Sequence, residues 1–106
     1  ARISDDRATE ASLYTIMGRA YQAQGELTYA QSYFRDTVVL FEQLNDPFAL
    51  ARAQTNLAAV LTRLKDYLTA GALLTSAEQI QMRLSDRVGL SATKHNRSVL
   101  LSYIAR

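Results

Sequence analysis

The sequence repeats itself with a period of 40 residues. Asp6, Asp46 and Asp86 are 40 positions apart, and small or apolar residues recur at the same spacing through the rest of the chain. The matched sets are Ala20/Val60/Leu100, Tyr21/Leu61/Leu101, Ala30/Ala70, Phe34/Leu74, Leu40/Ile80 and Leu50/Leu90, together with Asn56/Asn96. A fixed period of about 20 to 50 residues is typical of repeat architectures, in which each unit completes its core by stacking on the next.

Each unit reads as a pair of helices. In residues 51–64 the apolar side chains recur at helical spacing, at Ala53, Leu57, Ala58, Val60, Leu61 and Leu64. The pattern places Arg52, Thr55, Asn56, Thr62 and Arg63 on the other side. A second apolar stripe runs from Tyr67 to Ile80, and the polar turn Lys65-Asp66 separates the two. Helices joined by so short a turn lie antiparallel.

The pattern as a whole predicts an all-α chain of five helices. Asp46, Asp66 and Asp86 are expected to cap helix N-termini, because a carboxylate there accepts hydrogen bonds from free backbone N–H groups, and Pro47 suits a first helical position. The expected helices are 7–24, 27–44, 47–64, 67–84 and 88–106. Residues 1–7 resemble residues 83–87, so we expect them to form a helix end and a turn. We predict a single domain over 1–106, with one repeat over 7–44, a second over 47–84, and a half repeat or capping helix over 87–106.

The composition argues against several classes of protein. The hydrophobic fraction of 48% and the charged fraction of 21% are typical of a folded soluble protein. No apolar run approaches the ~20 residues of a membrane span, so no membrane contact is expected. The net charge of +2 comes without a dense basic stripe, so nucleic-acid binding is not expected. The absence of Cys fits a reducing compartment, and we expect a cytoplasmic location.

Catalytic, metal and cofactor sites are also not expected. His95 is the only histidine and there is no Cys, so neither a transition-metal site nor a nucleophile–base pair can be assembled. The four Gly are scattered, which excludes a phosphate-binding loop, and the carboxylates are spread over turns and outer faces. We therefore predict that the protein is not an enzyme, with a small helical hydrolase as the weaker alternative.

Residues 14–34 resemble the tetratricopeptide repeat family. Tyr14, Met17-Gly18 and Tyr21 follow the pattern of its first helix, and Ala30 with Phe34 follows that of its second. The second copy keeps the register more weakly, at Gln54, Leu57-Ala58, Leu61, Ala70 and Leu74, and the third keeps Ser98 and Leu101. The family period is about 34 residues, so the chain is similar to the branch with longer repeats. The resemblance implies a right-handed α-solenoid of antiparallel hairpins that acts in protein–protein interaction, as a scaffold or adaptor.

The resemblance also implies that the first helix of each pair lines a concave face that binds a peptide. The residues expected there are Ser12, Thr15, Ile16, Arg19 and Gln22, then Arg52, Thr55, Asn56, Ala59 and Arg63, then Ala92, His95, Asn96, Val99 and Tyr103. In the family an Asn at the position of Asn56 and Asn96 holds the backbone of a bound peptide, and an amide offers both a donor and an acceptor. The alternative is that these two Asn residues bond neighbouring helices and stabilise the stack.

Three arginines would add positive charge to the same face. Arg19, Arg52 and Arg63 suit carboxylates through the planar donor fork of the guanidinium group. The predicted peptide-binding residues are Asn56, Asn96, Arg19, Arg52, Arg63, Thr15 and Thr55. The expected partner is a protein or peptide that is acidic or ends in a carboxylate, unless the arginines pair with carboxylates on nearby helices.

The ends of the stack support a second hypothesis. Two and a half repeats leave apolar surface at one or both ends, and such surface promotes association. The chain would then be a structural or oligomerisation segment of a longer solenoid, or a homodimer formed through its terminal helices, without a ligand of its own.

Overall fold

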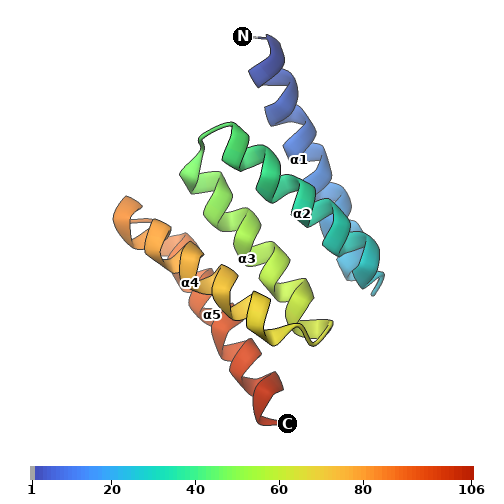
Figure 1. The fold of residues 1–106 in the computed structure, drawn as a ribbon, viewed down its shortest axis with the longest axis vertical. Coiled ribbons are helices and arrows are strands. Elements are labelled where there is room, and N and C mark those ends of the chain that lie inside the picture. Colours follow the sequence, from blue (N-terminus) through green and yellow to red (C-terminus); the bar gives the residue numbers. More distant parts are fainter. Residues whose placement is uncertain (1) are drawn as a thin grey trace.

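The chain folds into five helices joined by short turns. A computed structural model describes residues 2–106, with side chains from Asp6 onward. The helices are α1 (Arg2–Ala23), α2 (Leu27–Gln43), α3 (Pro47–Arg63), α4 (Tyr67–Leu84) and α5 (Arg87–Ala105). Each packs on the next in an antiparallel arrangement (Figure 1). The predicted all-α fold is therefore confirmed.

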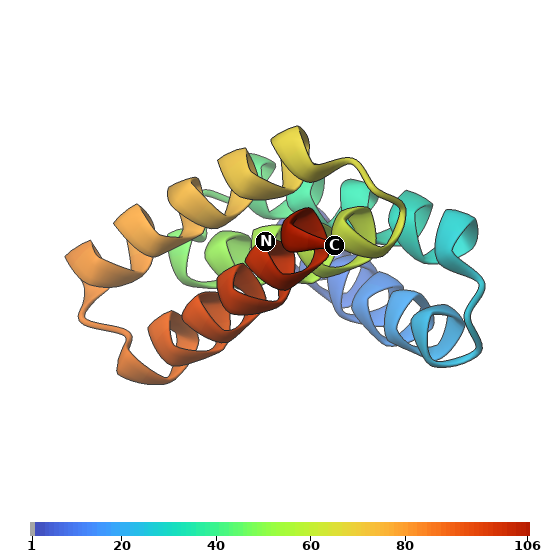
Figure 2. The same ribbon diagram turned by 90° about the horizontal axis from the view of Figure 1, so that it is seen from below.

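The helices form two curved layers. Viewed along the layers, α1, α3 and α5 lie on one side, and α2 and α4 lie on the other (Figure 2). The layer of α1, α3 and α5 lies on the inner side of the curve. The molecule measures 48 × 32 × 20 Å along its principal axes. Odd-numbered helices thus present one continuous concave face.

The four turns between helices share one conformation. Each places a single residue in the left-handed region, Gly25 (φ 81°), Asn45 (53°), Lys65 (70°) or Ser85 (55°). The next residue then donates its N–H to a carbonyl five positions earlier, as Glu26 does to Tyr21 at 2.9 Å. This closure satisfies a free carbonyl at the helix end. The turns recur every 20 residues, which is half of the sequence period.

Aspartates cap three of the helices, as predicted. The carboxylate of each accepts a hydrogen bond from a backbone N–H in the first turn, and Pro47 is the first residue of α3. The acceptor and donor pairs are Asp46–Ala49 at 3.1 Å, Asp66–Thr69 at 3.4 Å and Asp86–Gly89 at 3.0 Å. Glu26 occupies the same position before α2, but its longer side chain makes no capping hydrogen bond.

The expected turn near the start of the chain is wrong. α1 begins at Arg2 and runs through Asp6 without interruption, whereas the sequence predicted a helix end and a turn over residues 1–7. Ala1 lies outside the described residues. No Gly or Pro occurs in residues 2–7, so nothing in their backbone chemistry breaks the helix.

α3 is the central helix of the molecule. It packs against α2, α4 and α5. The main core cluster is Ala30, Phe34, Leu57, Ala58, Val60, Leu61, Ala70, Leu74 and Leu100. Thr55 and Thr62, which the helical pattern placed on the polar side, are also buried. A helix enclosed by three others has no wide solvent-facing side, and the Thr62 hydroxyl satisfies itself by donating to the Ala58 carbonyl at 2.8 Å.

Aromatic side chains join α1 to α2. The Tyr21 and Tyr33 rings stack with centroids 5.7 Å apart, and Tyr14 meets Tyr33 edge to face at 5.5 Å. Phe34 is fully buried beneath Gly18. Aromatic contacts therefore hold the first hairpin together, and Phe34 also joins it to the main core cluster.

Candidate binding site

The concave face is hollowed in two adjoining places. The polar hollow has a volume of about 300 Å³ and is lined by Thr15, Arg19, Arg52, Thr55, Asn56, Gln81, Gly89, Ala92 and Asn96. The apolar hollow has a volume of about 200 Å³ and is lined by Thr15, Phe41, Phe48, Ala49, Arg52, Ala53 and Asn56. Thr15, Arg52 and Asn56 line both, so the two hollows form one continuous groove.

Helix packing explains why the groove lies where it does. α3 and α5 pack directly against each other, but α1 packs on α2 and makes little contact with α3. The space left between α1 and α3 is the apolar hollow. The polar hollow extends from it across α3 towards α5.

The two predicted asparagines meet in the polar hollow. Asn56 is half-buried, and none of the described residues is hydrogen-bonded to its side chain. Asn96 donates from Nδ2 to the Ala92 carbonyl oxygen at 3.0 Å, a bond within its own helix. Neither side chain bonds a neighbouring helix in the described part of the chain. Both amides retain hydrogen-bonding capacity that faces the groove.

The three predicted arginines have different environments. Arg19 is exposed at the rim of the polar hollow and forms no ion pair with the side chains of residues 6–106. Arg52 donates from Nη2 to both oxygens of Asp86, at 3.2 and 3.3 Å, and stacks on the Phe48 ring with its guanidinium carbon 4.5 Å from the ring centroid. Arg63 is exposed in the last turn of α3 and lines neither hollow. The structure thus brings Arg19 and Arg52 together and leaves Arg63 apart.

The two predicted threonines form walls of the groove, with hydroxyls already bonded within the protein. Thr15 donates to the Ala11 carbonyl at 2.9 Å. Thr55 bonds the Ala51 carbonyl at 3.0 Å, and its Oγ1 lies 2.8 Å from that of Thr93.

Gln81 belongs to the site although the sequence analysis did not select it. Its side chain is buried, with the residue only 1% exposed, and it lines the polar hollow from α4. Its Oε1 accepts a hydrogen bond from the Thr93 hydroxyl at 2.7 Å, but its Nε2 has no partner. A Cβ on Gly89 would lie 2.9 Å from that Nε2 and would also clash with the Asp86 carboxylate. The sequence feature that could have indicated this contact is Gly89, which stands three positions after the capping Asp86.

The charges around the groove favour a negatively charged ligand. Arg19 and Arg52 line the polar hollow, and no Asp or Glu does. Asp86 lies behind Arg52 with its side chain only 7% exposed, where it offsets part of the Arg52 charge. Arg19 remains as the uncompensated charge at the rim.

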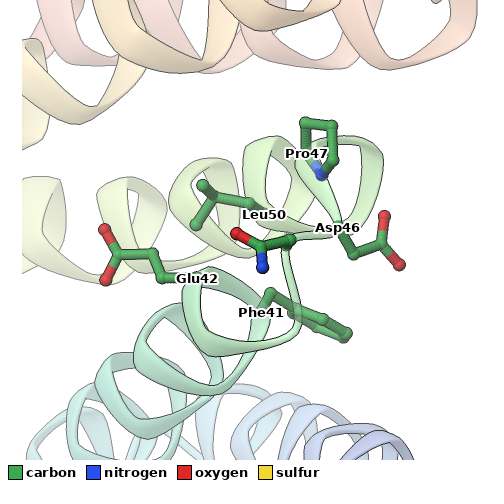
Figure 3. Close-up of a pocket in the computed structure, with 6 residues that line it drawn as sticks. Phe41, Glu42, Asp46, Pro47 and Leu50 are labelled. Atoms are coloured by element: carbon green, nitrogen blue, oxygen red, sulfur yellow. The ribbon is translucent and has the colours of Figure 1, made fainter.

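Two further hollows lie at turns and hold no comparable site. One is lined by Phe41, Glu42, Asn45, Asp46, Pro47 and Leu50, and the other is lined by residues 81, 82, 85, 86, 87 and 90, the same positions one repeat later. Figure 3 shows the Glu42 and Asp46 carboxylates directed to opposite sides of the first of these. These two hollows arise because the turns at Asn45 and Ser85 have the same geometry.

The described part of the chain forms neither a metal-binding cluster nor a membrane span. Among the side chains of residues 6–106 no three His, Cys, Asp or Glu gather where they could hold a metal ion, and His95 is exposed outside both hollows. None of these helices combines the length and apolar character needed to cross a membrane. No model of a known protein family matches the sequence, and no curated protein is similar enough to count as a relative.

Proposed function

We propose that this protein is a tetratricopeptide-type interaction module, a right-handed α-solenoid that holds a peptide segment of a partner protein in its concave groove. The observation that carries the proposal is the pair Asn56 and Asn96, which occupy equivalent positions in successive repeats and line the same hollow. Each amide can donate to and accept from a peptide backbone whatever the peptide sequence. In this role the protein is a cytoplasmic adaptor or scaffold and not an enzyme.

The test is selection of peptides from a random display library. Wild-type protein, the Asn56→Ala/Asn96→Ala variant and a Gln79→Ala control, in which an exposed amide on α4 is removed, are used as baits. Peptides that wild-type protein retains should bind the control equally and the double variant at least tenfold more weakly. The melting temperature should be nearly unchanged, because neither Asn bonds another helix. Equal binding to all three baits, or loss of stability in the double variant, would contradict the proposal.

Self-association through the ends is a second candidate. Leu13 and Ile16 on α1 are 54% and 64% exposed, and Leu101 and Ile104 on α5 are similarly exposed. Light scattering over a concentration series tests this candidate, and a mass equal to one chain at every concentration would exclude it.

A further inference from the structure

The two hollows occupy the same place in successive repeats. Five residues of the apolar hollow have counterparts 40 positions later in the polar hollow. The pairs are Thr15/Thr55, Phe41/Gln81, Ala49/Gly89, Arg52/Ala92 and Asn56/Asn96. The groove therefore presents one type of subsite twice.

One exchange gives the two subsites opposite chemistry. At the position where the outer helix of each hairpin reaches the groove, the first subsite has Phe41 and the second has Gln81. Phe48, Ala49 and Ala53 complete an apolar wall around Phe41. Such a wall favours an apolar side chain, because burying it there removes apolar surface from water.

The second subsite favours a hydrogen-bond acceptor over an apolar group. Gln81 Nε2 is a buried donor without a partner in the described protein, and a buried donor of this kind is destabilising until an acceptor reaches it. Arg19 and Arg52 stand at the same hollow. A carboxylate satisfies the buried amide donor and the charge of Arg19 together, which a neutral acceptor does not.

We propose that the two hollows read two side chains of one bound peptide, an apolar side chain in the hollow of Phe41 and an Asp or Glu carboxylate in the hollow of Gln81. This inference rests on the proposed function, since it assigns the ligand of the same groove. Asn56 lies between the two subsites and holds the backbone that joins the two side chains. Because alternate side chains of an extended chain point to one side, an odd number of residues separates the apolar residue from the acidic one, and the shortest such spacing is one residue.

Short capped peptides test the inference directly. The probes are Ac-Leu-Ser-Glu-NH2, its reverse Ac-Glu-Ser-Leu-NH2, and analogues in which Gln replaces Glu or Ser replaces Leu. Binding is followed by NMR titration of the ¹⁵N-labelled protein. One of the two Leu/Glu probes should shift the side-chain amide signals of Gln81 and Asn56 and bind at least fivefold more tightly than either analogue. Equal affinity for the Glu and Gln peptides, or no shift of a groove signal, would overturn the inference.

Two matched variants test which arginine causes the preference for the Glu peptide over the Gln peptide. Arg19→Gln should reduce the preference for Glu over Gln by at least threefold. Arg63→Gln removes the same charge from α3 outside both hollows and should leave the preference unchanged. If the two variants lose the preference equally, the selectivity reflects the net charge of the protein and the inference fails.

A graft of one subsite onto the other gives a stronger test. The variant Gln81→Phe/Gly89→Ala/Thr93→Ala copies three residues of the first subsite, Phe41, Ala49 and Ala53, into the second. It should bind Ac-Leu-Ser-Leu-NH2 more tightly than Ac-Leu-Ser-Glu-NH2, reversing the wild-type order. An unchanged order in a folded graft contradicts the inference, and if the graft does not fold, the Arg19 and Arg63 variants decide.

The outcomes separate this inference from the proposed function. If display selection yields peptides that depend on Asn56 and Asn96 but show no acidic preference, peptide binding stands and the assignment of the two subsites is wrong. If no peptide is retained and no probe shifts the groove signals, both fail.

Discussion

Gly18 shows how one missing methyl group sets the packing of the first hairpin. A Cβ at this position would lie 2.6 Å from Cε1 of the buried Phe34 ring. Overpacking of this kind costs about 1–3 kcal/mol, whereas Ala gains only about 1 kcal/mol over Gly in helix propensity. We predict that Gly18→Ala lowers the free energy of unfolding by about 1 kcal/mol, the difference between these effects. Urea unfolding measures this change in the free energy of unfolding.

A Phe34→Leu background provides the control for Gly18→Ala. The smaller side chain at position 34 should remove the destabilisation, and an equal loss of stability in both backgrounds would show that the clash is not its cause.

Tyr14 provides a pH-dependent prediction. The negative charge of Glu10, whose Oε2 lies 3.4 Å from the Tyr14 hydroxyl, raises the pKa of Tyr14 above its ordinary value, with a smaller effect from desolvation. Glu10→Gln should lower this pKa towards the ordinary value. Because the folded pKa is raised, folding favours the neutral phenol. That contribution to stability is present below the ordinary tyrosine pKa and is lost as the pH rises through the folded pKa.

NMR titration of ¹³C-labelled tyrosine measures the shift. Glu42→Gln, which removes a carboxylate from α2 without touching Tyr14, should leave the titration of Tyr14 in place. An unchanged Tyr14 pKa in Glu10→Gln would rule out the carboxylate as its cause.

Part of the groove could be predicted because its residues lie on odd-numbered helices and two positions repeat, Thr15 with Thr55 and Asn56 with Asn96. Thr15, Arg19, Arg52 and Asn56, with Thr55 and Asn96, line the polar hollow, whereas Arg63 from the same predicted set lines neither hollow. Gln81 and Phe41 were not predicted, because they belong to outer helices and reach the groove only at the helix end. The Gln81 side chain can extend into the groove because the following turn packs closely and Gly89 leaves room for it. Helical periodicity contains no information about such a contact.

At the scale of elements, the missing cap of α2 can be repaired. Glu26 has nearly the same backbone angles (φ −83°, ψ 74°) as the capping Asp66 (φ −90°, ψ 72°), but its side chain does not cap. We predict that Glu26→Asp raises the free energy of unfolding by about 0.5–1 kcal/mol, since a capping carboxylate satisfies a free N–H. Asp66→Ala should lower it by about 1 kcal/mol. Thermal unfolding compares the two, and a Glu26→Asp variant no more stable than Glu26→Ala would contradict the prediction.

The helix boundaries were largely predictable because the turn chemistry is local. Asp46 and Asp86 are helix caps, and the structure begins α3 and α5 at the residue directly after each, Pro47 and Arg87. The prediction for residues 1–7 is wrong because their sequence similarity to residues 83–87 does not bring the same conformation. Ser85 is held in the left-handed region where α4 meets α5. A short sequence match does not by itself reproduce that tertiary setting.

At the scale of the whole molecule, stability is distributed unevenly along the stack. α3 contacts three other helices, while α1 depends on α2. The two described ion pairs join α3, α4 and α5, where Arg52 of α3 binds Asp86 before α5 and Arg97 of α5 binds Glu78 of α4 at 2.6 Å. The first hairpin is therefore attached to the rest chiefly through apolar packing of α2 on α3.

This arrangement predicts an order of local opening. In a stack of repeats each unit is stabilised by its neighbours, so a terminal unit can open while the rest stays folded. Amides in residues 57–61 of α3 should exchange with solvent most slowly, and those of α1 should exchange faster, by opening of the first hairpin alone. Hydrogen exchange followed by mass spectrometry measures the order. Phe34→Leu, which loosens the contact of α2 with α1 beneath Gly18 as well as the edge of the main core cluster, should speed exchange most in α1 and α2 and least in α4 and α5. A uniform increase along the chain would instead show that the five helices unfold as one cooperative unit. The groove would then keep its shape until the whole molecule unfolds, whereas opening of the first hairpin alone removes Thr15 and Arg19 from the binding site before the rest is lost.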